Sequence, residues 1–283
     1  MSKIPLMDYV GRPLLAGVFL TLLLLQWRFP LRRQHFSVLQ RLVRNFVLSI
    51  PGFAIVRLAM LPIPLAVAMW AQDRHIGLLN WFSLPDWATA IATFLLMDYA
   101  YWWWHWANHM VPLFWRFHNV HHTDLDLDVS TAARFHFGEM FFSIGFLSLM
   151  VMIFGIAPLM LVISFITLEA ATLFHHSNWR LPIKVERILN MIVVTPRMHG
   201  IHHSIVQRET NSDWGAIFSR WDKLHRTLAE TGRSTPLLLM SQRIARNSNP
   251  PWENSSPCLF ADSARGACQT VSFRTVQFSV QID

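Results

Sequence analysis

Long apolar runs separated by short polar segments dominate the first two thirds of this chain. The four runs cover residues 13–27, 45–71, 87–104 and 140–174. A membrane-crossing helix needs about 20 predominantly apolar residues, so the first run is somewhat short and the others suffice. Pro51, Pro62 and Pro64 interrupt the second run, which predicts a kinked helix. The pattern therefore predicts several helices that cross a membrane.

Composition supports the same class of protein. The 283 residues are 53% hydrophobic and 14% charged, and the mean hydropathy is positive. Few charges combined with long apolar runs are typical of an integral membrane protein. Arg57 lies inside the second run, where an arginine either extends to the interface or is paired.

The net charge of +7 raises the question of nucleic-acid binding. The arginines flank apolar segments and form no continuous stripe, so we expect no nucleic-acid partner. The loop at residues 28–44 holds five arginines and no acid. Short loops rich in Lys and Arg face the cytoplasm. The predicted location is therefore a bacterial inner membrane or, in a eukaryote, the endoplasmic reticulum.

Histidines are the candidate chemistry, because eight of the fourteen fall into three clusters with helical spacing. The clusters contain His105 and His109, then His118, His121 and His122, then His199, His202 and His203. A single histidine is more often a surface residue or a satisfied core residue. Neutral imidazoles gathered on one face are better explained by a metal that binds them.

The number of imidazoles indicates two metals. A catalytic zinc takes three protein ligands and a structural zinc takes four, so eight exceed the needs of one ion. The only cysteines, Cys258 and Cys268, lie far along the chain and form no thiolate set. Imidazole ligands suit Fe, Cu, Zn and Ni, so the type of ligand does not select the metal.

Acidic residues near the clusters are candidates for orienting the imidazoles. Asp98 and Glu169 each precede a histidine, His105 and His176 respectively, by seven residues and share its helical face. We expect both carboxylates to accept an imidazole N–H and so fix its tautomer. For Asp98, a buried ion pair with an arginine is the alternative.

His136 and Glu139 end the polar, acidic loop at residues 123–139. They are three residues apart and could supply a further metal ligand and a carboxylate. Ordinary surface positions are an equally good reading of this pair.

The fourth apolar run should fold back as a hairpin of two short spans. Gly155, Ala157 and Pro158 interrupt it near the middle. A single crossing would also place the last histidine cluster on the opposite membrane face from the others. Of the adjacent His175 and His176, only one imidazole should face the site, and we favour His176.

The fold class predicted is therefore all-α: an integral membrane helical bundle with four to five membrane segments, including the hairpin. A cytosolic helical cap would hold the histidine-rich di-metal site. We divide the chain into N-terminal spans with a basic loop (1–86), a catalytic domain (87–228) and a disordered tail (229–283). The tail is rich in Ser, Asn, Pro, Arg and Gln and has no apolar periodicity.

The motifs HWANH, FHNVHH and MHGIHHS, with Asp98 before them and WDKL after them, resemble the fatty acid hydroxylase / sterol desaturase superfamily. These proteins are membrane non-haem di-iron oxygenases with three histidine boxes. The resemblance implies that the eight clustered histidines bind the metals. It also implies that His176 corresponds to a further family histidine, and that His136 lies in a family-like RFHxxE element.

The resemblance further implies two non-haem irons, O2 as co-substrate, and hydroxylation or desaturation of a lipid such as a fatty acyl chain or sterol. The chain has no dinucleotide, haem or iron–sulfur motif. Electrons would then come from a separate donor, a ferredoxin or a cytochrome. Two positions depart from common family patterns, Trp106 in the first box and His225 after the WD motif.

Two other classes of protein remain open at this stage. A membrane zinc hydrolase would need three or four of the histidines and neither O2 nor a reductant. A non-catalytic metal-binding or transport protein would have its histidines distributed across the bilayer. The sequence specifies neither the lipid nor the oligomeric state.

Overall fold

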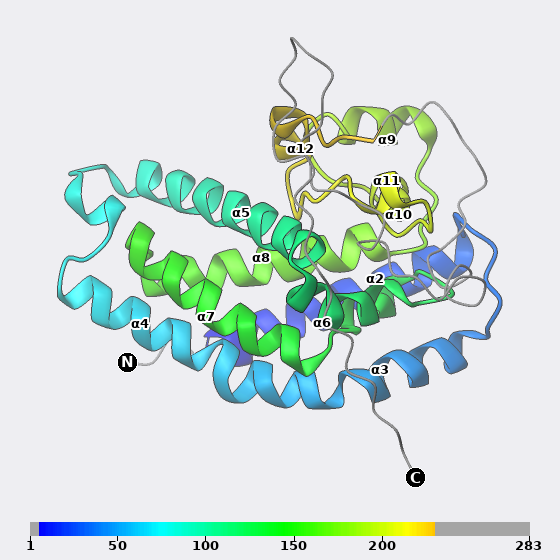
Figure 1. Ribbon diagram of the computed structural model, residues 1–283, viewed down its shortest axis with the longest axis horizontal. Helices are drawn as coiled ribbons and strands as arrows, with labels where there is room; N and C mark the ends of the chain where they lie inside the picture. Colours follow the sequence, from blue (N-terminus) through cyan, green and yellow to red (C-terminus); the bar gives the residue numbers. More distant parts are fainter. Residues whose placement is uncertain (1–5, 230–283) are drawn as a thin grey trace, which may run out of the picture.

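The computed structural model describes residues 6–229, and this part of the chain is a bundle of helices (Figure 1). The long helices and the short elements beside them are η1 (Met7–Gly11), α2 (Arg12–Arg28), α3 (Val38–Ile55), η2 (Val56–Met60), α4 (Pro62–Asp73), η3 (Leu78–Trp81), α5 (Asp86–Met110), α7 (Phe137–Phe154) and α8 (Pro158–His176). The remaining elements are α6 (Pro112–His122), η4 (Val129–Ala133), α9 (Ile183–Leu189), α10 (Pro196–His202), α11 (Gln207–Thr210) and α12 (Arg220–His225). The predicted all-α class is confirmed; residues 230–283, most of the predicted disordered tail, lie outside the described residues.

Four segments are long and apolar enough to cross a membrane. They are Met7–Arg28, Val38–Trp81, Phe137–Phe154 and Pro158–His176. The predicted span at residues 87–104 is not among them, although α5 has 25 residues. Its tryptophans, tyrosines and Asp98 lower its hydropathy, so α5 is a long helix of the bundle without the composition of a lipid-exposed span.

The second apolar run is interrupted where the prolines predict it. Pro51 lies inside α3, a π-helical turn follows at η2, and Pro62 begins α4. Proline removes a backbone donor and is tolerated at the start of a helix. Arg57, in η2, lies 3.6 Å from a carboxylate oxygen of Asp8 in η1, so of the two expected alternatives the structure shows pairing.

The predicted hairpin is present as α7 and α8. Gly155 ends α7 in the left-handed region with a φ of 70°, and Pro158 is the first residue of α8. The connection between α4 and η3, which contains Gly77, packs directly on this turn. A Cβ atom on Gly77 would lie 2.2 Å from the Gly155 nitrogen. Glycine at both positions lets two backbones meet at the end of the bundle away from α10.

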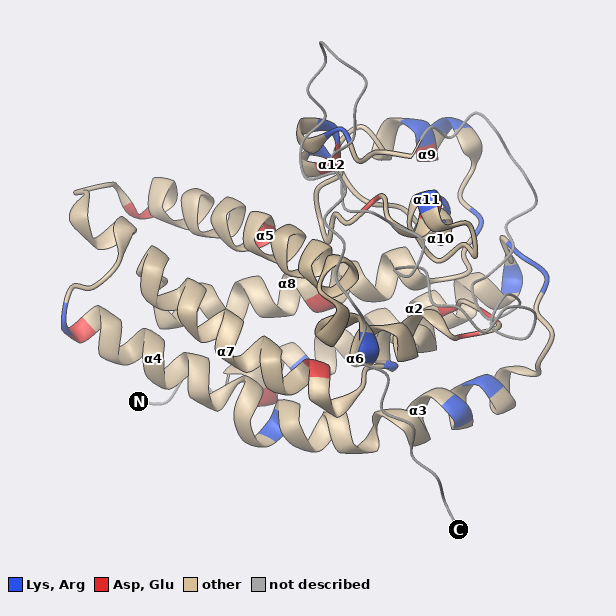
Figure 2. Ribbon diagram, in the orientation of Figure 1, with Lys and Arg blue, Asp and Glu red and all other residues tan. Residues whose placement is uncertain are grey.

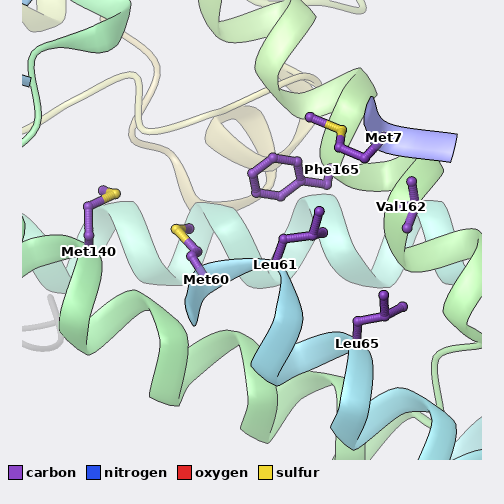
Figure 3. Close-up of a cluster of buried hydrophobic side chains, with 7 residues drawn as sticks. All are labelled: Met7, Met60, Leu61, Leu65, Met140, Val162 and Phe165. Carbon is purple, nitrogen blue, oxygen red and sulfur yellow. The ribbon is translucent and has the colours of Figure 1, made fainter. Parts of the chain in front are cut away.

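An apolar cluster fills the centre of the bundle between η1, η2, α4, α7 and α8. Figure 3 shows its buried side chains, which are Met7, Met60, Leu61, Leu65, Met140, Val162 and Phe165. A second cluster around Leu147, Val151 and Leu161 extends the core toward the hairpin turn. Burying these side chains contributes the main favourable term in folding.

The acidic loop after α6 is buried and holds the N-terminal spans in place. Asp128 accepts from Arg41 Nε at 2.6 Å, and Asp126 accepts from the backbone nitrogens of His35 and Phe36. Asp124 accepts from Asn45 Nδ2 at 2.9 Å. Figure 2 shows many of the Lys and Arg residues at this same end of the bundle, over the start of α3 and over α9. The basic loop and the loop that follows the second histidine cluster therefore share one end of the molecule.

Candidate metal centre

Nine imidazoles meet at that end and divide into two groups. The first, the five-histidine group, consists of His105, His109, His118, His122 and His202. The second, the four-histidine group, consists of His121, His176, His199 and His203. Within each group, one ligand nitrogen from every ring lies within 4.8 Å of all the others. All but His105 are buried, and each group can hold a metal ion.

Four helices supply eight of these rings at or near their C-terminal ends, and His203 directly follows α10. The last turns hold His109 in α5, His121 and His122 in α6, His176 in α8, and His199 and His202 in α10. The C-terminus of a helix carries a partial negative charge from its free carbonyl groups. Four such ends pointing at one place favour a bound cation there.

Hydrogen bonds at the Nδ1 atoms of the five-histidine group orient the rings. His105 Nδ1 lies 3.0 Å from the Trp214 carbonyl oxygen, and His202 Nδ1 lies 2.7 Å from that of Ser212. His118 Nδ1 lies 3.0 Å from Glu139 Oε1. Because these oxygens only accept, each Nδ1 carries the proton and the Nε2 lone pair is left for a metal.

The four-histidine group contains nitrogen contacts that neutral rings alone do not satisfy. His176 Nδ1 donates to the Thr172 carbonyl oxygen at 2.8 Å, which makes its Nε2 an acceptor. Its Nε2 lies 2.8 Å from His121 Nε2 and 3.0 Å from His199 Nε2. His199 Nε2 also lies 3.1 Å from His203 Nε2. If His199 Nε2–H donates to His176 Nε2, that nitrogen has no free lone pair and cannot accept a hydrogen bond from His203 Nε2.

A metal ion resolves this conflict. Bonds of roughly 2.1 Å from one ion to several imidazole nitrogens place those nitrogens about 3 Å apart, as in the three Nε2 contacts of the four-histidine group. Several other ring nitrogens, among them both of His109 and Nε2 of His202, are buried without a hydrogen-bond partner. Buried polar atoms without partners are rare in folded proteins. The donor set therefore fits metal ions.

Burial also keeps the rings in the neutral form that binds metals. Burial, and then the other histidines, lower the pKa of His122, His199 and His203 well below the ordinary value of 6.5. Burial lowers the pKa of His202 to about 3, against a smaller opposite effect of its hydrogen bond to Ser212. These imidazoles are neutral at pH 7.

The expected roles of Asp98 and Glu169 are wrong. The Asp98 carboxylate accepts from the backbone nitrogens of Ile217 and Phe218 at 3.0 and 3.1 Å, and from Trp221 Nε1 at 2.7 Å. It fixes the segment before α12 and has no hydrogen bond to any of the nine imidazoles. The Nδ1 of His176 donates to the backbone of Thr172, so it has no N–H left for Glu169.

His136 is in neither group. It begins α7 as the N-cap residue, accepting from the Gly138 nitrogen at 3.0 Å, and it stacks on Phe117. This half-buried histidine therefore has a capping contact in the structure, and its role as a metal ligand stays a prediction. Glu139, its partner in the sequence argument, reaches His118. His175 is buried beside the site with its ring 4.1 Å from that of His199, but it belongs to neither group.

The oxygens that orient His202 and His105 have no signal in the sequence. They are the backbone carbonyls of Ser212 and Trp214, and any residue type could provide those. Asp222 of the WD motif accepts from Trp102 Nε1, the backbone nitrogens of Trp214 and Gly215, and the Thr227 hydroxyl. His225, which replaces a more usual family residue, stacks on Trp102 at 4.1 Å. This part of the site is therefore a scaffold.

The sequence model of the fatty acid hydroxylase family matches residues 90–227, a range that contains all nine grouped histidines. This region of the chain, 138 of the 283 residues, belongs to the family. The match begins within α5 and ends just after α12, so the family region covers the helices that carry the histidines and the cap above them. The N-terminal spans lie outside it.

Curated relatives of this chain are named as hydroxylases or monooxygenases. An ornithine lipid hydroxylase of Rhizobium tropici is 31% identical over 168 residues, covering 57% of this chain and 48% of the relative. Alkylglycerol monooxygenase of Homo sapiens is 28% identical over 57% of this chain and 34% of its own length. Cholesterol 25-hydroxylase of Homo sapiens is 28% identical over 47% of this chain and 48% of its own length.

The aligned part therefore spans about a third to a half of each of these relatives. None of the solved structures matches the chain significantly.

Proposed function

We propose that this protein is a membrane-bound, O2-dependent oxidoreductase that hydroxylates or desaturates a lipid at a pair of histidine-bound irons. The observation that carries the proposal is the division of nine imidazoles into groups of five and four, in a helical bundle that contains four membrane-capable segments. The names of the relatives, which hydroxylate or monooxygenate three different lipids, support the reaction class.

Iron suits this assignment better than zinc because the reaction is a redox reaction and zinc does not change its oxidation state. Hydroxylation would follow the balance R–H + O2 + 2 e⁻ + 2 H⁺ → R–OH + H2O. The bound irons would supply the activation of O2. The protein's own contribution is the set of oriented rings, with Glu139 and the carbonyls of Ser212 and Trp214 fixing their tautomers.

The lipid would reach the site from the bilayer. The spans around the site are apolar, and many of their large side chains, such as Leu20, Leu58 and Phe141, are exposed on the outside of the bundle. We place the histidine end on the cytoplasmic side because the arginine-rich loop before α3 is bonded to the segment that follows α6.

A separate protein would deliver the two electrons, since the family region has no cysteine and the chain has no flavin or haem motif. We assign catalysis to residues 87–228. Residues 1–86 would form membrane spans that pack against this catalytic domain. A ferredoxin or cytochrome would dock on the cytoplasmic end.

The direct test uses the purified full-length protein. We expect about two irons per chain by elemental analysis, and O2 uptake that requires both a reductant and a lipid extract. Mass spectrometry then separates the two reactions, since hydroxylation adds one oxygen atom and desaturation removes two hydrogens. Turnover that continues without O2 would show a hydrolase instead.

Two variants sharpen the test. His121→Ala removes a ring of the four-histidine group and should abolish O2 uptake. His136→Asn is the matched control, because asparagine keeps the N-cap of α7 and this histidine lies outside both groups. Equal activity of the two variants would refute the proposal.

A further inference from the structure

A cavity of about 570 Å³ lies between the end of α2 and the start of α3. Its lining comprises Leu23, Leu24, Gln26, Trp27, Pro30, Arg32, Arg33, Gln34, Val38 and Arg41. One wall is apolar and comes from α2, and the other carries three arginines. No acidic side chain lines it.

Several donors at this cavity have no partner. Arg32 Nε, Arg32 Nη1 and Gln34 Nε2 are buried and make no hydrogen bond with the described residues. The exposed Arg33 likewise makes no ion pair within residues 6–229. Arg41 differs, since it is bound to Asp128 and to the Phe36 carbonyl oxygen. Burying a cationic donor without a partner is costly, so Arg32 and its neighbours are suited to an anion.

Nearby acids do not neutralise this charge. Glu186 is the acid whose charge acts on Arg32, and its carboxylate already binds Arg197 Nε at 3.0 Å and the Thr195 hydroxyl at 3.1 Å. Burial, and then the charge of Arg197, lower the pKa of Arg32 to about 10. Arg32 is still charged at pH 7, within a local excess of positive charge.

The apolar wall indicates that the anion belongs to a lipid. Leu24 and Trp27 are 63% and 71% exposed on α2, which is one of the four membrane-capable segments. Tryptophan is enriched at the level of lipid headgroups. The cavity therefore joins a surface for acyl chains to a cluster of arginines at the membrane interface.

We propose that this cavity binds the headgroup of an anionic phospholipid, with the phosphate against Arg32, Arg33 and Gln34 and an acyl chain along Leu24 and Trp27. Arginine forms bidentate, charge-assisted hydrogen bonds with phosphate. The site is separate from the histidine groups and does not depend on the proposed reaction.

Arg32 also connects this cavity with the third histidine cluster. Its Nη2 donates to the Pro196 carbonyl oxygen at 2.6 Å, at the start of α10. A Cβ atom at position 200 would lie 1.6 Å from Arg32 Nη2, so the guanidinium packs on Gly200. A headgroup that fixes Arg32 would therefore also fix the helix that carries His199 and His202.

The test measures lipid binding to the delipidated, full-length protein in detergent. Native mass spectrometry would compare a short-chain phosphatidylglycerol with the phosphatidylcholine of the same chains. We expect one phosphatidylglycerol to bind at least about tenfold more tightly than phosphatidylcholine, with the preference lost in Arg32→Gln/Arg33→Gln. Arg33→Gln alone, at an exposed position, should weaken binding and keeps the test valid if the double variant does not fold.

Arg28→Gln and Arg44→Gln are matched controls, because both arginines lie near the cavity, stack on phenylalanines and do not line it. Neither should change the preference. Equal binding of the two lipids, or equal losses in the control variants, would overturn the proposal. Displacement of phosphatidylglycerol by millimolar inorganic phosphate would also overturn it, since the site would then bind a soluble anion.

Discussion

His118 and Glu139 meet in the interior of the bundle, with Nδ1 of the imidazole 3.0 Å from Oε1 of the carboxylate. They come from α6 and α7, and both side chains are buried. Among the nine grouped rings, the other three whose Nδ1 contacts an oxygen meet a backbone carbonyl, in His105, His176 and His202. Glu139 therefore gives the five-histidine group a negative charge at its edge that the four-histidine group lacks.

We predict that Glu139→Gln weakens metal binding by the five-histidine group. The amide is neutral and a weaker acceptor, so His118 loses both its orientation and some basicity. Partners of this kind typically change metal affinity about 10–100-fold when they are removed. Competition with a chelator measures the effect, and Glu169→Gln is the control because that acid contacts none of the rings through a hydrogen bond. Equal metal loss in both variants would contradict the prediction.

We predict that Asp98→Asn lowers stability without removing metal. An amide offers one acceptor where the carboxylate offers two, and its N–H2 would face the donors at Ile217, Phe218 or Trp221. Losing hydrogen bonds to a buried charged acceptor costs about 1.5–3 kcal/mol each. The thermal midpoint should fall by several degrees while the iron per folded chain stays constant. A variant with unchanged Tm and reduced iron would instead support the role expected from the sequence, in which Asp98 orients an imidazole.

The error over Asp98 and Glu169 shows what helical periodicity can and cannot predict. A spacing of seven places two residues on one face, which was correct. It also separates them by two turns, or about 10 Å along the axis, which is too far for a carboxylate to reach the imidazole. A spacing of four keeps two rings in one group, as for His105 and His109, His118 and His122, and His199 and His203. A spacing of three does not, because His121 and His202 fall in the opposite group from the other two rings of their clusters.

Long-range partners could not be predicted. The hairpin followed from Gly155 and Pro158, because those residues act locally. The division into groups of five and four depends on where α8 and α10 end relative to α5 and α6, and no spacing contains that information. The contacts of the Ser212 and Trp214 carbonyls could not be predicted either, because every residue has a backbone carbonyl.

Asp213 predicts a pH dependence of stability. Burial, and then Asp222, raise its pKa to about 8, although the Ala229 nitrogen donates to it. Its unfolded pKa is about 4. The folded chain thus retains a proton that the unfolded chain has released, so stability falls as pH rises from about 4 to 8, by up to about 1.4 kcal/mol per pH unit.

Asp213→Asn should remove this dependence. Asparagine is neutral at every pH and tolerates the left-handed backbone at this position, where φ is 53°. We expect the variant to equal the parent near pH 4 and to exceed its thermal midpoint increasingly toward pH 8. Melting curves in detergent across this range measure the difference. A constant offset at all pH values would show that the substitution acts through packing.

The two histidine groups should differ in their tolerance of a lost ligand. His109→Ala leaves four imidazoles in its group, whereas His176→Ala leaves three. His176 is also the ring whose Nε2 contacts both His121 and His199, so its removal opens the centre of its group. After dialysis against a moderate chelator, we expect about one iron per chain in His176→Ala and close to two in His109→Ala, by elemental analysis. Because both variants remove one buried imidazole, equal iron contents would show that the groups do not act as separate sites.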